Sequence, residues 1–234
     1  YEAAIMANPG AGMAIIELGE INRELEIPVG EQIELYESHM ETVTLYNPAV
    51  YQLVELYILN GRNQDALKFL NHTQFNSWEG RYGIHQLWVQ ANIKQGDVEF
   101  DNGNFEKALW YYQQSLLYPD NLEVAEQPNT IHARKKYLIG KTLVAMGKKQ
   151  EAREYFEAAI ADQAEAYNAY QYYRGKAMEA TGEKKEAILV YEKMLDSLGD
   201  TWPEGGQPAQ DRIREQSVWW YARGLALEGL GKSK

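Results

Sequence analysis

The stretch of sequence that decides the fold is 137–195. It reads YLIGKTLVAMGKKQEAREYFEAAI at 137–160 and, after a short break, YYRGKAMEATGEKKEAILVYEKML at 172–195. Five positions recur 35 residues apart: Gly140 and Gly175, Gly147 and Gly182, Ala152 and Ala187, Phe156 and Tyr191, Ala159 and Met194. A fixed period of this size is typical of a solenoid that has one helix pair per repeat.

A glycine followed five residues later by an alanine marks four places in the chain. The pairs are Gly61 and Ala66, Gly103 and Ala108, Gly147 and Ala152, Gly182 and Ala187. We expect each glycine to end a helix in the left-handed conformation, which is cheap only for glycine. We expect each alanine to lie where the partner helix approaches most closely.

A second glycine stands seven residues before the turn glycine. It is present as Gly96, Gly140, Gly175 and Gly224, and the first repeat has Val54 instead. A glycine inside a helix costs about 1 kcal/mol relative to alanine. Its recurrence at one offset therefore predicts close helix packing that offsets this cost.

These residues resemble the tetratricopeptide repeat (TPR) from Val50 to the C-terminus. The resemblance implies an all-α fold, a right-handed superhelix of antiparallel helix pairs. The spacing stretches to 42 residues between Ala66 and Ala108 and to 49 between Gly175 and Gly224, so the linkers are longer than a minimal repeat needs. The last copy reaches Gly231 after one helix, which is a common form of cap.

The expected organisation is an atypical N-terminal helical cap at 1–47, followed by one continuous repeat array at 48–234. The array has about four repeats and a terminal capping helix. Within the cap, apolar spacing and Pro/Gly breaks predict helices at 2–7, 13–25 and 31–45. About eleven helices are expected in all.

A narrower resemblance involves FNSWEGRYGI (75–84) and SLLYPDNLEVAE (115–126). These segments look like the C-terminal TPR region of large bacterial proteins of unknown function, in which a domain similar to galactose mutarotase lies upstream. The start, YEAAIMANPGAG, has no initiator Met and no basic signal region, so we expect a fragment or processed chain.

The composition limits the partners. The net charge is −11, from 34 acidic and 23 basic residues, which disfavours nucleic acid and an anionic membrane surface. There is no cysteine, so disulfides and thiolate metal sites are excluded. No apolar run approaches the roughly 18 residues of a membrane span. We expect a cytoplasmic protein, with the periplasm as the alternative.

No catalytic constellation is visible. The four histidines, at positions 39, 72, 85 and 132, form no pair at metal-ligand spacing, and no serine sits in a nucleophile elbow. We therefore predict that the chain is not an enzyme and has no metal or cofactor.

Three tyrosines precede the first glycine of a repeat by three residues: Tyr137, Tyr172 and Tyr221. In TPR proteins this position faces the concave groove. Three cations lie one helical turn from a tyrosine on the same face, and they are Arg134, Lys141 and Lys176. Rings and cations together suit an extended or anionic ligand. The alternative is that the tyrosines brace adjacent helices.

Three long linkers, at 72–82, 118–129 and 199–209, offer a second candidate site. They contain Trp78, Glu79 and Trp202, and aromatic rings beside carboxylates suit a carbohydrate. The alternative is that these tryptophans cover helix ends.

The leading hypothesis is a non-catalytic scaffold that binds a peptide or protein domain in a concave groove. An upstream domain of the same polypeptide is one candidate partner. A second hypothesis is an accessory helical domain of a carbohydrate-active bacterial protein. A third is a homodimer formed through the last helix.

Overall fold

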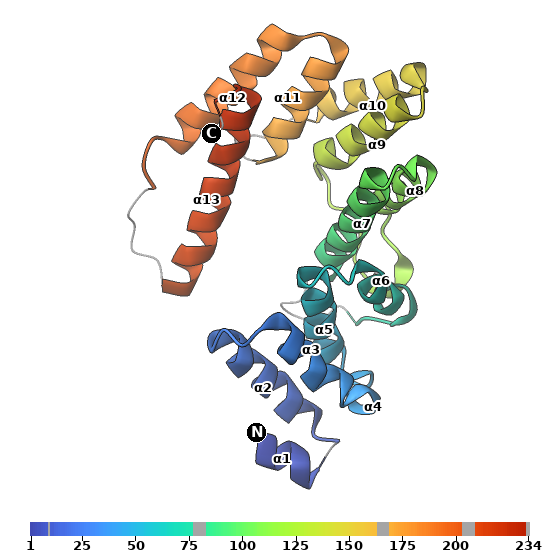
Figure 1. Cartoon of the computed structure of the whole chain (residues 1–234), viewed down its shortest axis with the longest axis vertical. Helices are drawn as coiled ribbons and strands as arrows, with labels where there is room; N and C mark the ends of the chain where they lie inside the picture. Colours follow the sequence, from blue (N-terminus) through green and yellow to red (C-terminus); the bar gives the residue numbers. More distant parts are fainter. Residues whose placement is uncertain (9, 77–82, 163–168, 203–208, 233–234) are drawn as a thin grey trace. The chain divides into compact units, whose positions relative to one another are not determined.

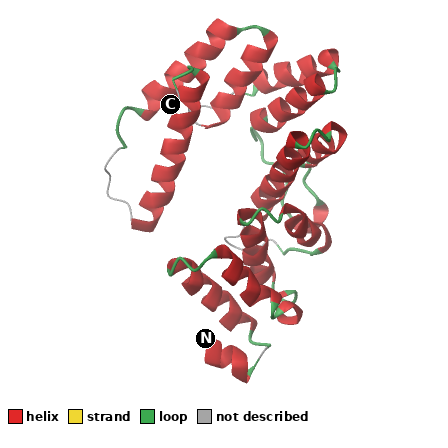
Figure 2. Ribbon diagram, viewed as in Figure 1, coloured by secondary structure: helices red, strands yellow, loops and turns green. Residues whose placement is uncertain are grey.

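The computed structural model describes residues 1–8, 10–76, 83–162, 169–202 and 209–232. Over these residues the chain is all-α, with thirteen α-helices, one short 3-10 helix and no strand (Figure 2). The residues form two compact units, Tyr1–Gln127 and Pro128–Lys234. In the part of the chain that is described, no helix is both long enough and apolar enough to cross a membrane.

Unit 1 (Tyr1–Gln127) contains the helices α1 to α8 and η1, which are labelled in Figure 1. Their bounds are α1 Glu2–Ala7, α2 Gly12–Glu24, α3 Val29–Glu37, α4 Met40–Val43, α5 Asn47–Leu59, α6 Asn63–His72, α7 Ile84–Asp101, α8 Phe105–Gln114 and η1 Asp120–Leu122. Helices α5 and α6 form one pair and α7 and α8 the next, and α2 and α3 pack against α5.

The helix expected at 31–45 is interrupted, and this part of the prediction is wrong. Helix α3 ends at Glu37, and α4 starts afresh at Met40. At the break, Ser38 Oγ donates to the Leu35 carbonyl, and the Nδ1 atom of His39 lies 2.9 Å from the same oxygen. Side chains that bond the backbone compete with the helical hydrogen bonds. The interruption is one reason why thirteen helices replace the expected eleven.

Unit 2 (Pro128–Lys234) contains α9 Ala133–Ala145, α10 Lys149–Ala161, α11 Ala169–Thr181, α12 Lys184–Leu198 and α13 Ala209–Gly229. Helices α9 and α10 form an antiparallel pair, and α11 and α12 form another (Figure 1). Helix α11 packs against α9 on one side and against α13 on the other. The first helices of successive repeats therefore neighbour one another.

The turn glycines have the predicted left-handed conformation. Their φ angles are 78° at Gly61, 77° at Gly103, 79° at Gly147 and 97° at Gly182, and Gly231 after α13 has 67°. The residue after each glycine donates its N–H five residues back, as Lys148 does to the Leu143 carbonyl at 2.9 Å. This is the Schellman arrangement, which satisfies the last carbonyls of the helix.

The second set of glycines receives aromatic rings, as the close-packing prediction requires. A Cβ on Gly140 would lie 2.6 Å from Cε1 of Phe156, and a Cβ on Gly175 would lie 2.4 Å from Cε1 of Tyr191. Gly96 has the same relation to Tyr112. At Gly224 the prediction is wrong, because a Cβ there would have no atom within 4 Å. The four alanines, Ala66, Ala108, Ala152 and Ala187, are fully buried.

Two of the long linkers hold each other in unit 1. Asn121, in η1, donates from Nδ2 to the carbonyls of Leu70 and Thr73, both at 2.8 Å, and so caps the end of α6. The N–H of Phe75 donates to the Asn121 carbonyl at 2.8 Å. Phe75 and Leu122 are buried. The described parts of these linkers are thus structural.

Candidate interaction surface on unit 2

The predicted tyrosines lie on the three first helices of unit 2. Tyr137 is on α9, Tyr172 on α11 and Tyr221 on α13. Because α11 packs against both of the other helices, the three tyrosines lie on neighbouring helices, and the residues on these helices form a candidate surface. We call it the first-helix face and define it by Tyr137, Lys141, Tyr172, Lys176, Glu179, Tyr221 and Glu228.

Tyr172 holds two of these helices together. Its side chain is only 6% exposed, and its hydroxyl donates to Oε1 of Glu228 on α13 at 2.6 Å. Burial and the hydrogen bond to Glu228 raise the pKa of Tyr172 above its usual range. The hydroxyl therefore stays protonated and keeps its role as donor. This is the arrangement that the bracing alternative describes.

Glu179 is the polar centre of α11. Its Oε2 accepts from Nζ of Lys176 at 2.6 Å, and its Oε1 accepts from the hydroxyl of Tyr191 at 3.1 Å. Partial burial acts to lower the pKa of Lys176, but the hydrogen bond and the charge of Glu179 outweigh it, so the pKa is raised. Lys176 is thus a half-buried cation with a fixed partner.

Tyr137 is half-buried between neighbouring rings. Its centroid lies 5.9 Å from that of Phe156 and 6.0 Å from that of Tyr173. Burial raises the pKa of the Tyr137 hydroxyl, and the nearby charge of Lys176 opposes the shift. Arg134 places its guanidinium carbon 5.5 Å from the centre of the Tyr173 ring, within cation–π range.

The exposed part of the face lies at its two sides. On α9, Lys141 is exposed and Val144 is 45% exposed. On α13, Tyr221 is 51% exposed, and Glu228 is also exposed. Apolar, cationic and anionic groups thus flank the buried ring of Tyr172.

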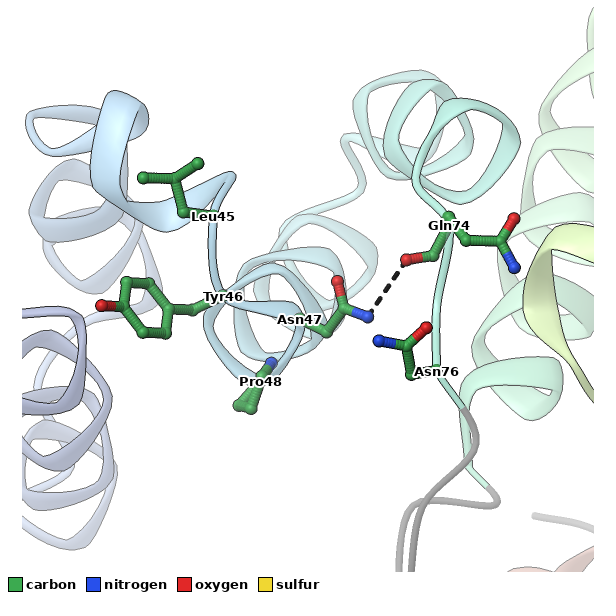
Figure 3. A pocket seen from close by; sticks show the side chains of 6 residues that line it. All are labelled: Leu45, Tyr46, Asn47, Pro48, Gln74 and Asn76. Carbon is green, nitrogen blue, oxygen red and sulfur yellow. Dashed lines mark hydrogen bonds between the residues drawn. The ribbon is translucent and has the colours of Figure 1, made fainter.

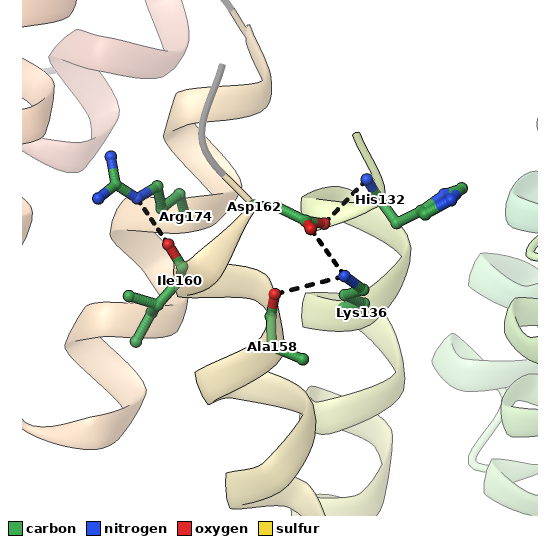
Figure 4. Close-up of polar contacts among 6 residues, drawn as sticks. All are labelled: His132, Lys136, Ala158, Ile160, Asp162 and Arg174. Carbon is green, nitrogen blue, oxygen red and sulfur yellow. Dashed lines mark hydrogen bonds and ion pairs between the residues drawn. The ribbon is translucent and has the colours of Figure 1, made fainter. Parts of the chain in front are cut away.

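A set of polar contacts joins α9, α10 and α11 to one another (Figure 4). One carboxylate oxygen of Asp162 accepts from the backbone N–H of His132 at 2.9 Å. The other accepts from Nζ of Lys136 at 2.7 Å. Nε of Arg174 donates to the Ile160 carbonyl at 2.9 Å. Asp162 therefore joins the start of α9 to the end of α10, and Arg174 joins α10 to α11.

The predicted loop site is only partly described. Trp78 and Glu79 lie outside the described residues. The ring of Trp202 lies edge-to-face with that of Trp219 on α13, with centroids 6.1 Å apart and an interplanar angle of 79°. Trp202 thus contacts the last helix of unit 2.

Unit 1 has a cavity of about 410 Å³ that no motif in the sequence indicated (Figure 3). Nδ2 of Asn47 donates to the Gln74 carbonyl across it at 3.1 Å. Its lining side chains carry no charge, and they are Leu45, Tyr46, Asn47, Pro48, Gln74 and Asn76. They offer amide hydrogen bonds and apolar surface but no group for acid–base chemistry. Among the described residues, no three His, Asp or Glu side chains gather as a metal site.

Sequence reasoning missed Glu179 and Glu228 as members of the first-helix face. Each stands seven residues after a predicted tyrosine, Tyr172 and Tyr221 respectively, which is two helical turns along the same stripe. That spacing was a usable signal. The pairing of Tyr172 with Glu228 was not visible, because it joins residues that are 56 apart.

Residues 137–203 match the family model of the tetratricopeptide repeat. The match confirms the family resemblance over that segment. A search of curated proteins found no match.

Two solved structures are similar to the chain. One is a crystal structure of MamA, with 20% identity, a TM-score of 0.42, and coverage of 76% of this chain and 93% of that chain. The other is a Podospora anserina chain assigned as a kinesin light chain with nearly identical TPR-like repeats. It has 18% identity, a TM-score of 0.45, and coverage of 80% of this chain and 93% of that chain.

Proposed function

We propose that the chain, whose residues 137–203 carry tetratricopeptide repeats, is a non-catalytic scaffold that binds a peptide or protein domain. The proposed binding surface is the first-helix face of unit 2. The observation that carries the proposal is the combination of a rigid centre, where Tyr172 is bonded to Glu228, with exposed side chains on either side of it.

The side chains have different roles in this proposal. Tyr221 and Lys141, which are exposed, contact the ligand directly. Tyr137 and Lys176 contribute their exposed edges. Tyr172 positions the others, because its hydroxyl and ring are already buried in unit 2. Tyr172 and Lys176 are held by Glu228 and Glu179 before binding, so these two side chains lose little entropy when the ligand arrives.

The charges of the face indicate which ligands fit. Lys176 is paired with Glu179, and Glu228 adds a second carboxylate, so the face is mixed in sign. We therefore propose a peptide recognised by ring contacts and hydrogen bonds rather than by net charge. Its affinity should depend only weakly on salt, since the ion pair is already formed within the protein.

The test is selection from a displayed library of random peptides against the full chain. Selected peptides are then measured by calorimetry against the wild type and the Tyr221→Ala and Lys141→Ala variants. We expect Tyr221→Ala to weaken binding by at least about tenfold, because aromatic residues dominate interface energies.

Trp220→Ala is the matched control. Trp220 is the neighbouring residue on α13 and is equally exposed, at 55%, but it points away from Tyr221 around the helix. The proposal requires that Trp220→Ala leave peptide affinity unchanged. Selected peptides that bind all of these variants equally would refute it.

An upstream domain of the same polypeptide remains a candidate partner within this proposal. It can be tested by the same calorimetry once that domain is expressed. The carbohydrate alternative has less support, because the one described tryptophan of the loop site, Trp202, has its ring against Trp219.

A further inference from the structure

Two first helices of unit 2 carry a glutamate at the same position, but the residue before it differs in charge. In each helix three residues, spaced four and then three apart, lie on one stripe. On α11 they are Tyr172, Lys176 and Glu179, and on α13 they are Tyr221, Leu225 and Glu228. The stripe of α11 therefore has both a cation and an anion, whereas that of α13 has the anion alone.

On α11 the glutamate receives its cation from its own helix. Nζ of Lys176 donates to Oε2 of Glu179 at 2.6 Å, so the two charges compensate each other. Leu225 stands in the place of this lysine on α13. The lack of a local cation on α13 thus follows from residue 225 itself and not from what packs against the helix.

Glu228 has a neutral donor but no ion pair. Its Oε1 accepts from the hydroxyl of Tyr172 at 2.6 Å. In the part of the chain that the structure describes, no Lys, Arg or His side chain forms an ion pair with Glu228. The carboxylate therefore presents a negative charge that the protein does not compensate by direct contact.

The stripe stays accessible when helices pack on both sides of it. Helix α11 has α9 on one side and α13 on the other, yet the side chains of Lys176 and Glu179 are still 28% and 30% exposed. On α13, Glu228 is exposed, and Leu225 is half-buried against the core of unit 2. Accessible apolar surface thus lies one turn before an exposed carboxylate.

We propose that the peptide bound by the first-helix face carries a long basic side chain, lysine or arginine, at the position that meets α13. Its charged head pairs with Glu228, and its alkyl stem lies over Leu225. Such side chains place their stems on apolar surface while the head keeps a polar partner. The ligand thus gives Glu228 the cation that Lys176 gives Glu179. This inference rests on the proposed function, because it names one group of the same ligand.

The preference for a basic residue is local to α13. Lys141 and Arg134 on α9 are positive, and Lys176 and Glu179 compensate each other, so the face as a whole is not acidic. We therefore expect one basic residue at a fixed position of the ligand rather than a peptide of high positive charge. A single exposed ion pair also agrees with a weak dependence of affinity on salt.

Calorimetry of the full chain with peptides selected against it tests the inference. Each selected peptide is compared with a copy that has norleucine in place of the basic residue, which keeps the stem and removes the charge. We expect the norleucine copy to bind the wild type about fivefold more weakly, the upper end for an exposed ion pair. Glu228→Gln, which removes the other charge, should bind the two peptides equally.

Leu225→Lys reproduces the stripe of α11 on α13. Glu228 then has a cation of its own, so the preference for the basic peptide should disappear. Leu225→Met is the matched control, because it keeps an apolar side chain of similar volume, and the ratio of the two affinities should stay at about fivefold. Tyr172→Phe removes the hydroxyl that bonds Glu228 but keeps the charge, so this ratio should also be kept.

Failure of this inference differs from failure of the proposed function. If Tyr221→Ala weakens both peptides but norleucine costs no affinity, the basic side chain is refuted and the binding surface stands. A preference that survives Glu228→Gln, or selected peptides that share no basic residue, refutes it in the same way. Peptides that bind Tyr221→Ala as tightly as the wild type refute both the inference and the proposed function.

Discussion

The hydroxyl of Tyr172 on α11 donates a hydrogen bond of 2.6 Å to Oε1 of Glu228 on α13. This bond ties the last helix to the repeat before it. Hydrogen bonds to charged groups contribute about 1.5–3 kcal/mol when they are well shielded. Because Glu228 is exposed, we expect Tyr172→Phe to lower the free energy of unfolding by about 1 kcal/mol, measured by urea denaturation.

Glu228→Gln supplies the control for this bond. In a double-mutant cycle, the two changes together should cost less than the sum of the single changes, because they remove the same interaction. Additive effects would show that Tyr172 and Glu228 stabilise the protein separately.

High pH should destabilise the protein through its buried tyrosines. Burial raises the pKa of Tyr172 and of Tyr191, each with a glutamate as a further cause. A tyrosine in the unfolded chain ionises at about pH 10, whereas these two hydroxyls keep their protons to higher pH in the folded protein. The unfolded state then binds fewer protons, so stability is fully present below about pH 10 and falls as the pH rises.

The dependence can be measured by urea denaturation at a series of alkaline pH values. We expect the free energy of unfolding to fall less steeply with pH in Tyr172→Phe and Tyr191→Phe than in the wild type. An equal slope in all three proteins would assign the loss to other groups.

The helix glycines should respond in opposite ways to alanine. At Gly175 a Cβ would lie 2.4 Å from Cε1 of Tyr191, so Gly175→Ala must displace a buried ring. Overpacking costs about 1–3 kcal/mol, which exceeds the gain of about 1 kcal/mol in helix propensity. At Gly224 only the gain applies, so Gly224→Ala should stabilise the protein by up to about 1 kcal/mol.

The first repeat suggests a compensating change. It has Val54 at the glycine position and, 16 residues later, Leu70 where the other repeats have a ring, and both residues are fully buried. Gly140→Val combined with Phe156→Leu reproduces this pair. We expect the double variant to be more stable than Gly140→Val alone, as measured by thermal unfolding. A lower stability of the double variant than of Gly140→Val would mean that the smaller side chain at 156 does not compensate for the larger one at 140.

Asp162 should be important for the junction of α9 and α10. Asp162→Ala leaves the N–H of His132 without its carboxylate acceptor and Lys136 without its ion-pair partner. We expect a loss of about 1–3 kcal/mol in the free energy of unfolding. Asp196→Ala is an exposed control on α12, and its effect should be within about 0.5 kcal/mol. Equal losses in both variants would show that the contacts of Asp162 at this junction stabilise the protein no more than an exposed carboxylate does.

The local rules predicted much of the fold from the sequence. Gly61, Gly103, Gly147 and Gly182 adopt the left-handed turn that only glycine makes cheaply, and Ala152 and Ala187 are fully buried where the helices meet. These features depend on a few consecutive residues and on a fixed spacing. A fixed spacing can be read without knowing which side chain meets which.

Features that depend on distant partners could not be read in this way. Asn121 caps α6 although 51 residues separate it from Leu70, and the second cap helix breaks because Ser38 and His39 bond the backbone instead of continuing it. Gly224 carries the same sequence signal as Gly140 and Gly175, although a Cβ on it would meet no atom within 4 Å. The structure shows on which helices the predicted site residues lie, but their contact with a ligand stays a prediction.

Hydrogen exchange of the full chain with and without a selected peptide tests the central claim most directly. If the first-helix face binds the peptide, protection should increase at backbone amides of α9, α11 and α13, around Tyr137, Lys176 and Tyr221. The second helices α10 and α12 should show little change. Protection confined to α10 and α12, or to unit 1, would contradict the account.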